Sequence, residues 1–170
     1  MKIIAMGMLT MLGTMTGGCV MAVGNTTTET MPVAIERETI SYETSPCFGT
    51  CPVYRVTVQP DGSGVFEGKR FTKVEGIRAF RASPAQYQAF AAKLERYRPR
   101  QGEQLIQPGR PGCTNAPTDM PSVDIRWNEP SGAAQHLSFY YGCAMSNQAM
   151  NEALRSAPND LPIGAFIEPN

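Results

Sequence analysis

The chain has 170 residues, of which 42% are hydrophobic and 18% are charged. This length corresponds to about one domain, and the hydrophobic share is sufficient to form a core. Fifteen basic and fifteen acidic residues give a formal net charge of zero, so long-range attraction to nucleic acid or to anionic lipid is not expected. We therefore expect no nucleic-acid partner.

The first 18 residues have the pattern of a secretory signal peptide. Lys2 is followed by an apolar run over residues 3–15 and then by small residues. A basic start, an apolar run of about a dozen residues and small residues before a cleavage site are typical of such signals. The run is shorter than the ~20 residues that a membrane-spanning helix needs. The protein is therefore predicted to be exported.

Cys19 is the expected site of a lipid anchor. Gly17-Gly18-Cys19 resembles the lipobox of bacterial lipoproteins, although Thr16 stands where Leu is usual. The cysteine is followed by Val20 rather than Asp. In Gram-negative lipoproteins this resembles the sorting signal for the outer membrane. We expect the protein on the periplasmic side of that membrane, with residues 19–35 as a tether. The alternative is cleavage after Ala22, which would leave a soluble periplasmic protein.

Residues 36–170 are predicted to form a single domain of short strands and two helices. Apolar and polar residues alternate in several short stretches, as they do in strands with one buried face. Pro60-Asp61-Gly62-Ser63-Gly64 separates two of these stretches. It is typical of a hairpin turn, because glycine tolerates the positive φ angles of tight turns. The expected strands lie around residues 40–42, 53–58, 65–66, 123–127 and 137–141, and residues 76–80 could add a further strand.

Two segments have the three-to-four-residue spacing of amphipathic helices. The first begins at Ser83-Pro84-Ala85-Gln86, which predicts a capping box with proline at the first helical position, and it ends before Pro99. The second is expected to be capped by Ser146 and stopped by Pro158. Both apolar stripes are expected to pack on the core. The stripes are Tyr87, Phe90, Ala91, Leu94 and Tyr97 in the first helix, and Met150, Ala153, Leu154 and Ala157 in the second.

Residues 99–121 are rich in Pro and Gly, show no periodicity and are predicted to be a long loop. Loops of this length are usually functional or held by cross-links. Strands grouped with helices between and after them predict an α+β fold. We expect a small antiparallel sheet of about five strands, with two helices packed on one face and disulfide bonds as staples.

Four cysteines remain after the signal, and in an exported protein they are expected to form disulfide bonds. Four cysteines can pair in three ways. Cys47 and Cys51 are close enough to pair around Gly49. Cys113 lies in the long loop, and Cys143 follows the last strand. We expect the bonds Cys47–Cys51 and Cys113–Cys143.

The short cysteine pair has a second interpretation, in thiol exchange or copper handling. The Cys-x-x-x-Cys-Pro pattern at 47–52 resembles a motif of thioredoxin-like assembly proteins, whose two thiolates bind Cu(I) with a distant histidine. Soft thiolate ligands do select Cu(I). A helix follows the motif in that family, whereas Val53–Val56 predict a strand here, and the single histidine is His136. A structural turn is preferred, and a periplasmic thiol-redox or Cu(I)-handling protein is the alternative.

The sequence predicts no catalytic group, no metal site and no cofactor. Asp119 and Asp124 are not spaced for acid–base work, and Asp119 is expected to turn the backbone into the next strand. The serines lack the context of a nucleophile elbow, and His136 has no recognisable triad partner. A hydrolase would require His136 to lie near a serine or an aspartate in space.

Residues 45–54 read Ser-Pro-Cys-Phe-Gly-Thr-Cys-Pro-Val-Tyr and are followed by a strand and a turn. This arrangement resembles the opening of a bacterial family known as domain of unknown function 6438. The likeness covers roughly residues 36–167 and includes Gly68, the Ser83-Pro84 helix start and the segment 118–122. Cys113 and Cys143 look like an addition found in some members, including exported lipoproteins. The family has no known activity, so the resemblance implies fold and location but no catalytic residue.

We expect a cell-envelope lipoprotein that acts as a non-enzymatic binding or structural module. An envelope protein, a peptide or a small ligand is expected to meet the surface around the short cysteine pair and the long loop. Two cross-linked loops without a catalytic group favour binding over chemistry. The residues expected to form this surface are Phe48, Gly49, Thr50, Tyr54 and Asp119.

Overall fold

The structure is a computed structural model and describes residues 38–168. The signal peptide predicted over residues 1–18, the lipidation site Cys19 and the tether predicted over 19–35 lie outside the described residues. Within the described part of the chain, no helix is both long enough and apolar enough to cross a membrane.

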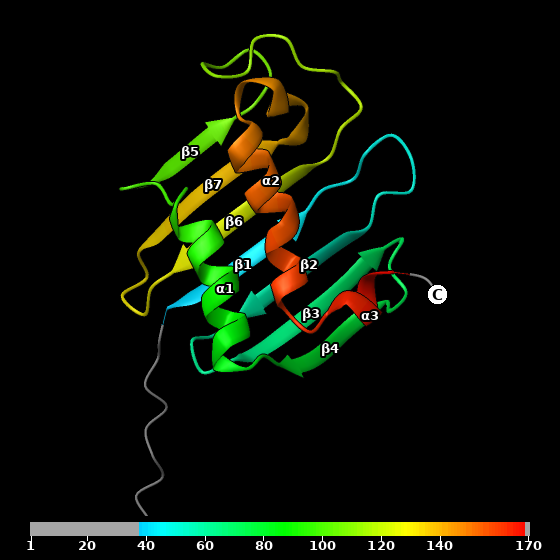
Figure 1. Ribbon diagram of the computed structural model, residues 1–170, viewed down its shortest axis with the longest axis vertical. Helices are drawn as coiled ribbons and strands as arrows, with labels where there is room; N and C mark the ends of the chain where they lie inside the picture. Colours follow the sequence, from blue (N-terminus) through cyan, green and yellow to red (C-terminus); the bar gives the residue numbers. More distant parts are fainter. Residues whose placement is uncertain (1–37, 169–170) are drawn as a thin grey trace, which may run out of the picture. The chain divides into compact units, whose positions relative to one another are not determined.

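A seven-stranded sheet is the framework of the described domain (Figure 1). Its strand order is β4-β3-β2-β1-β6-β7-β5. Neighbouring strands are antiparallel except at one edge, where β5 runs parallel to β7. The strands are β1 (Thr39–Thr44), β2 (Val53–Val58), β3 (Ser63–Arg70), β4 (Gly76–Arg81), β5 (Glu103–Ile106), β6 (Ser122–Asn128) and β7 (Ala134–Tyr140).

Strand β1 lies at the centre of the sheet, because it pairs with both β2 and β6. Ile40 is opposite Val58 on one side and Trp127 on the other, and all three side chains are buried. The alternation that the sequence shows in these strands is present in the structure, since buried side chains recur at every second position. Strands β1 and β6 therefore each turn one apolar row toward the helices.

Two main helices, α1 (Pro84–Glu95) and α2 (Gln148–Ser156), lie side by side on one face of the sheet (Figure 1). Helix α1 begins with the predicted capping box. The N–H of Gln86 donates to Ser83 Oγ at 3.3 Å, and the N–H of Ser83 donates to Gln86 Oε1 at 2.9 Å. Because each end of this pair satisfies the other, the start of α1 is fixed by four consecutive residues.

The start of α2 differs from the prediction at Ser146. This serine ends a short 3-10 helix, η1 (Tyr141–Ser146), and α2 begins after Asn147 without a side-chain cap. The prediction is wrong because the chain turns through η1 before α2 starts. Two short elements complete the chain, η2 (Ala157–Asp160) and α3 (Gly164–Ile167).

The core fills the space between the sheet and the helices. Phe90 and Leu94 of α1 and Leu154 of α2 are fully buried, as the helical spacing predicts. Burial of each such side chain contributes ~1.5–3 kcal/mol to the free energy of folding. The sheet contributes the fully buried rings of Trp127, Tyr42, Phe66 and Phe139.

The sheet is larger than the expected antiparallel sheet of about five strands, and it is mixed rather than antiparallel. The parallel edge strand β5 lies inside residues 99–121, which were expected to be a loop. Strand β5 has only four residues and one buried side chain, Ile106, so the sequence contains no recognisable alternation there. Its position is set by long-range pairing with β7.

The face of the sheet opposite the helices carries a charged network. The Glu43 carboxylate is 2.7 Å from Arg55 and also contacts Lys69, while Glu67 lies 3.6 Å from Arg55. Burial acts to raise the pKa of Glu43, but Lys69 and Arg55 outweigh this effect and hold the pKa below its ordinary value. An antiparallel sheet commonly has one such solvated face.

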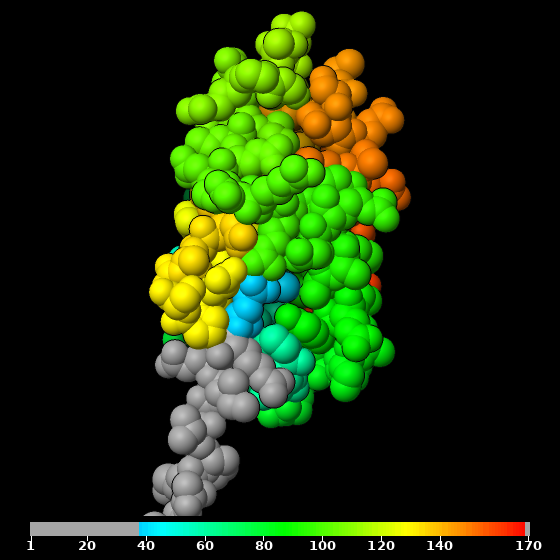
Figure 2. Space-filling view, turned by 90° about the vertical axis from the view of Figure 1, so that its left-hand side faces the viewer, coloured from blue at the N-terminus to red at the C-terminus, as the bar shows by residue number. Residues whose placement is uncertain are grey.

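Arg98 ties the end of α1 to the start of β1. Its guanidinium nitrogens lie 2.5 and 3.1 Å from the Glu38 carboxylate, and one of them lies 2.6 Å from Gln135 Oε1. Figure 2 shows the segment after α1 (green) against the start of β1 (blue) and the β6–β7 turn (yellow). The first described residue is therefore fixed at the start of β1, at the opposite end from Thr44.

Candidate functional site

The first stapled loop, residues 45–52, connects β1 to β2. It contains the expected Cys47–Cys51 disulfide bond, with a Cα–Cα distance of 5.8 Å. Gly49 has a φ of 144°, which residues with a Cβ rarely adopt, and its N–H donates to the carbonyl oxygen of Cys47 at 3.0 Å. The loop is held in one shape, and the Phe48 side chain on it is 89% exposed.

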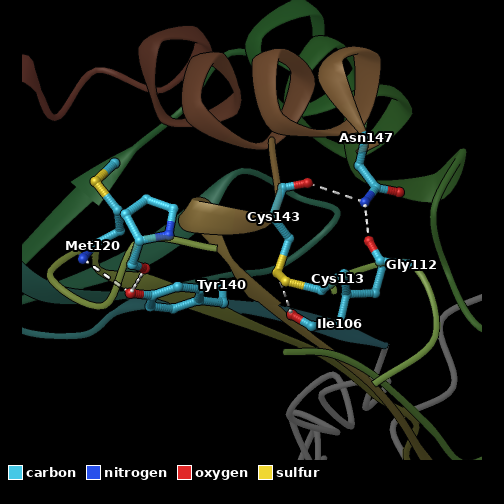
Figure 3. The surroundings of a disulfide bond; sticks show 8 residues. Ile106, Gly112, Cys113, Met120, Tyr140, Cys143 and Asn147 are labelled. Atoms are coloured by element: carbon cyan, nitrogen blue, oxygen red, sulfur yellow. Dashed lines mark hydrogen bonds between the residues drawn. A yellow bond between two sulfur atoms is a disulfide. The ribbon is translucent and has the colours of Figure 1, made fainter. Parts of the chain in front are cut away.

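The second stapled loop, residues 107–121, connects β5 to β6. The expected Cys113–Cys143 disulfide bond joins it to η1, immediately after β7 (Figure 3). The side-chain amide of Asn147 donates to the carbonyl oxygens of Gly112 at 3.0 Å and of Cys143 at 3.1 Å. The amide of Asn147 therefore bridges the second stapled loop and η1, the two segments that the disulfide bond connects.

Tyr140 holds the far end of the second stapled loop. Its hydroxyl donates to the carbonyl oxygen of Pro117 at 2.6 Å and accepts from the N–H of Met120 at 3.1 Å (Figure 3). A Cβ at Gly142 would lie 2.4 Å from the Tyr140 ring, so glycine permits this close approach. The loop is cross-linked near its middle and hydrogen-bonded near its end.

The two stapled loops lie against one another at one end of the sheet. The N–H of Phe48 donates to the carbonyl oxygen of Asp119 at 3.3 Å. Next to this contact, the N–H of Ser45 donates to the carbonyl oxygen of Ser122 at 2.9 Å, and the N–H of Ser122 donates to Ser45 Oγ at 2.7 Å. The loops form one surface, called here the stapled surface.

Four of the five expected surface residues are exposed, and Tyr54 is not. Phe48, Gly49, Thr50 and Asp119 are exposed, whereas Tyr54 is only 6% exposed. A shift of register between Val53 and Tyr54 in the β2–β3 pairing coincides with burial of both side chains. The expectation that Tyr54 lies at the surface is therefore wrong.

The sequence reasoning missed Met145, whose side chain is 84% exposed. It lies in η1, two residues after Cys143, beside the attachment point of the second stapled loop. Phe48 and Met145 are the two most exposed large apolar side chains among the described residues. Each follows a disulfide cysteine, and no sequence periodicity marks such positions.

A pocket of about 220 Å³ opens beside the first stapled loop. Residues from both loops, from the sheet and from the helical layer meet there, which explains why the local sequence does not indicate it. We call it the tyrosine pocket. It is lined by Tyr42, Thr44, Cys51, Pro52, Tyr54, Pro121, Tyr141, Arg155 and Ile167.

The three tyrosines of the pocket are buried and remain neutral. Burial raises the pKa of Tyr42, Tyr54 and Tyr141 above the ordinary value of 10.0. The Tyr42 hydroxyl donates to the carbonyl oxygen of Leu154 at 3.1 Å and lies 3.2 Å from the Tyr141 hydroxyl. The wall therefore presents uncharged aromatic rings and phenols.

Arg155 supplies the charge of the pocket. Its guanidinium carbon lies 4.0 Å from the centroid of the Tyr141 ring, a cation–π contact. Its Nε donates to Asn151 Oδ1 at 3.1 Å. A cation on α2 is thus held over an aromatic wall.

The amino-acid sequence of the chain matches one protein family. The sequence model of that family, described as "Domain of unknown function (DUF6438)", matches residues 38–161. The chain belongs to the DUF6438 family. The match contains both stapled loops and Arg155, and it ends before α3. Neither a curated protein nor a solved structure matches the chain.

His136 of this DUF6438 domain has an aspartate partner that sequence reasoning missed. Its Nε2 is 2.7 Å from Asp124 Oδ1, and its Nδ1 is 3.5 Å from Glu103. Ser138, the nearest serine on the same strand, is 4% exposed, and its Oγ accepts from Gln107 at 3.3 Å. Because both ring nitrogens of His136 face carboxylates, the pair His136 and Asp124 does not activate a serine nucleophile in this structure.

The surroundings of Cys47 and Cys51 differ from those of a thioredoxin-like motif. The residues after Cys51 form strand β2, as the sequence predicts, rather than a helix that would lower a thiol pKa. The single histidine is engaged on β7, as described above. Among residues 38–168, no three His, Cys, Asp or Glu side chains are grouped as metal ligands.

Proposed function

We propose that this DUF6438 protein is a cell-envelope lipoprotein whose domain is a non-enzymatic binding module. Lipidation at Cys19 and a position on the periplasmic side of the outer membrane are supported by the N-terminal sequence pattern. The partner is an envelope protein or peptide that binds the stapled surface.

The exposure of Phe48 carries this proposal. A large aromatic side chain that is 89% exposed on a loop fixed by a disulfide gains nothing from packing within the domain. Aromatic side chains and methionine are enriched at protein interfaces, and a rigid loop loses little conformational entropy on binding. Met145, which is 84% exposed, adds a second apolar contact at the neighbouring staple.

The direction of β1 fits a tethered binding module. The chain enters the domain at Glu38, and the first stapled loop follows Thr44 at the other end of the strand. Six residues of strand span about 20 Å. A domain held through residue 38 therefore presents the stapled surface away from its point of attachment.

Site-specific photo-cross-linking in the native envelope tests the proposal. A cross-linking amino acid at Thr50 should form a discrete adduct that Phe48→Ala weakens. The matched control position is Ser131, which is exposed on the β6–β7 turn at the other end of the sheet. Adducts that are the same from both positions, or that persist in Phe48→Ala, would contradict a binding surface at the stapled loops.

The intact mass of the protein from the membrane fraction tests the anchor separately. A mature chain that begins at Cys19 and carries the added mass of acyl chains is expected. A mature chain that begins at Val23 would show that the protein is soluble in the periplasm and that the lipid anchor is wrong.

A further inference from the structure

Arg155 has no acidic partner in the tyrosine pocket. It is the one charged residue among the described residues that line this pocket. Within residues 38–168, no carboxylate lies within ion-pair distance of its guanidinium. The pocket therefore carries one positive charge that the domain itself does not neutralise.

Arg155 is an exposed residue, and its guanidinium contacts only neutral groups among the described residues. Its Nε donates to Asn151 Oδ1 at 3.1 Å, and its plane lies over the ring of Tyr141. The two terminal nitrogens have no hydrogen-bond partner among the described residues. A planar guanidinium can bind a carboxylate through two parallel hydrogen bonds. The two terminal nitrogens of Arg155 are therefore free to donate to a carboxylate ligand.

The remaining walls suit a small apolar group. Pro52, Pro121 and Ile167 line the pocket together with the three tyrosines. Burial keeps these phenols neutral by raising the pKa of each, so the walls do not repel an anion. The volume of about 220 Å³ is below the ~300–1,000 Å³ of sites for drug-sized ligands. It suits a carboxylate and one neighbouring side chain.

The groove between α1 and α2 is larger, at about 450 Å³, but its charges are mixed. It is lined by Lys93, Arg96 and Glu152 among others, and Lys93 is paired with Asp160 at 2.7 Å. The tyrosine pocket is therefore the better candidate for an anion.

We propose that the tyrosine pocket binds a carboxylate with one adjoining apolar side chain, and that Arg155 is its anion-binding residue. This inference rests on the proposed binding function and names the chemistry of one ligand group. The carboxylate has two possible sources, the C-terminus of a polypeptide and a small carboxylic acid.

Titrations of the oxidised protein followed by NMR test the inference with matched acids and amides. The probes are acetyl-Ala-Pro-Leu with a free carboxylate or a C-terminal amide, and 3-phenylpropionate or its amide. The readouts are the Nε–H signal of Arg155 and the backbone signals around Cys51 and Pro121. Each acid should bind about tenfold more tightly than its amide, as a charge-assisted hydrogen bond predicts.

Variants separate the charge of Arg155 from the fold. Arg155→Gln should remove the preference for acid over amide, and Arg155→Lys should keep part of it. The matched control is Arg96→Gln, which removes an exposed arginine of the groove between α1 and α2 and should leave the preference intact. A tighter tripeptide assigns the polypeptide C-terminus as the source, and a tighter 3-phenylpropionate assigns a small acid.

Two results would overturn the inference. Equal binding of acid and amide would show that the pocket does not select a carboxylate, and unshifted pocket signals at millimolar concentrations of all four probes would show that it does not bind one. Neither result bears on the cross-links from Thr50, so failure of this inference and failure of the proposed function are distinguishable.

Discussion

The hydroxyl oxygens of Tyr42 and Tyr141 lie 3.2 Å apart between the sheet and α2. Since the Tyr42 proton is directed at the carbonyl oxygen of Leu154, 3.1 Å away, the Tyr141 hydroxyl is the donor to Tyr42. Both phenols are buried. This short chain of hydrogen bonds connects the central strand, η1 and α2 at the back of the tyrosine pocket.

Tyr42→Phe should destabilise the domain by about 1–2 kcal/mol, because it removes two buried hydrogen bonds and leaves the Tyr141 hydroxyl without its acceptor. Urea unfolding followed by far-UV circular dichroism measures this loss. The matched control is Tyr97→Phe, since the Tyr97 hydroxyl has no hydrogen-bond partner within residues 38–168. Equal losses in the two variants would show that the hydrogen-bond chain contributes nothing.

The same tyrosines predict a loss of stability at high pH. Burial is the main cause that raises the pKa of Tyr42, Tyr54 and Tyr141 above 10.0. The unfolded chain loses these protons near pH 10, and the folded domain keeps them to higher pH. The stabilising effect is therefore complete below about pH 10 and is lost as the pH rises beyond it.

Absorbance at 295 nm checks this prediction, with urea-unfolded protein as the control. In the unfolded control all six tyrosines should ionise near pH 10. In the folded protein the buried tyrosines should ionise later and together with loss of structure. Ionisation of all six near pH 10 without unfolding would contradict burial of the pocket tyrosines.

The sequence predicts best what depends on neighbouring residues. The capping box of Ser83 and Gln86 needs only four consecutive positions, and the alternation around Ile125 and Trp127 needs one strand. The parallel pairing of β5 depends on residues more than 30 positions away, so a four-residue strand with one buried side chain could not be recognised. The strand count was therefore too low.

In the candidate site, too, features that depend on neighbouring residues were predicted and features that depend on distant residues were not. The first stapled loop was found because Cys47 and Cys51 are close in sequence. The contact of His136 with Asp124 depends on the register of the β6–β7 hairpin, in which His136 is opposite Arg126, and a slip of one residue would turn His136 to the other face. The tyrosine pocket is formed by loops, sheet and helix that are distant in sequence. The sequence around Arg155 therefore gave no indication that this residue lines a pocket.

The two disulfide bonds should contribute unequally to stability. On the chain-entropy model, the bond Cys113–Cys143, with a sequence separation of 30, contributes about 3.5 kcal/mol, whereas Cys47–Cys51, with a separation of 4, contributes about 2 kcal/mol. The double alanine variant of each pair, compared by urea unfolding, measures both values. A larger loss from the short pair would mean that the first stapled loop supports the fold more than its length implies.

The reduction potential of Cys47–Cys51 decides between a structural bond and the alternative of thiol exchange or Cu(I) handling. For a structural bond we expect a potential below about −300 mV and no tight Cu(I) binding by the reduced protein. Mass spectrometry after equilibration in dithiol buffers gives the potential, and the Cys113→Ala/Cys143→Ala variant isolates the short pair. A potential near that of the thioredoxins, about −270 mV or higher, together with tight Cu(I) binding, would favour the alternative.

Gly68 should be among the least replaceable positions of the sheet. A Cβ at this position would lie 1.8 Å from the carbonyl oxygen of Val74, and backbone cannot move aside as a flexible side chain can. Gly68→Ala should therefore cost at least ~2 kcal/mol and loosen the β3–β4 connection. Gly164→Ala is the matched control, since open space surrounds that position at the start of α3 and the change should be close to neutral. Urea unfolding should thus show a large loss for Gly68→Ala alone, and a neutral Gly68→Ala would contradict the close packing of β3 against residue 74.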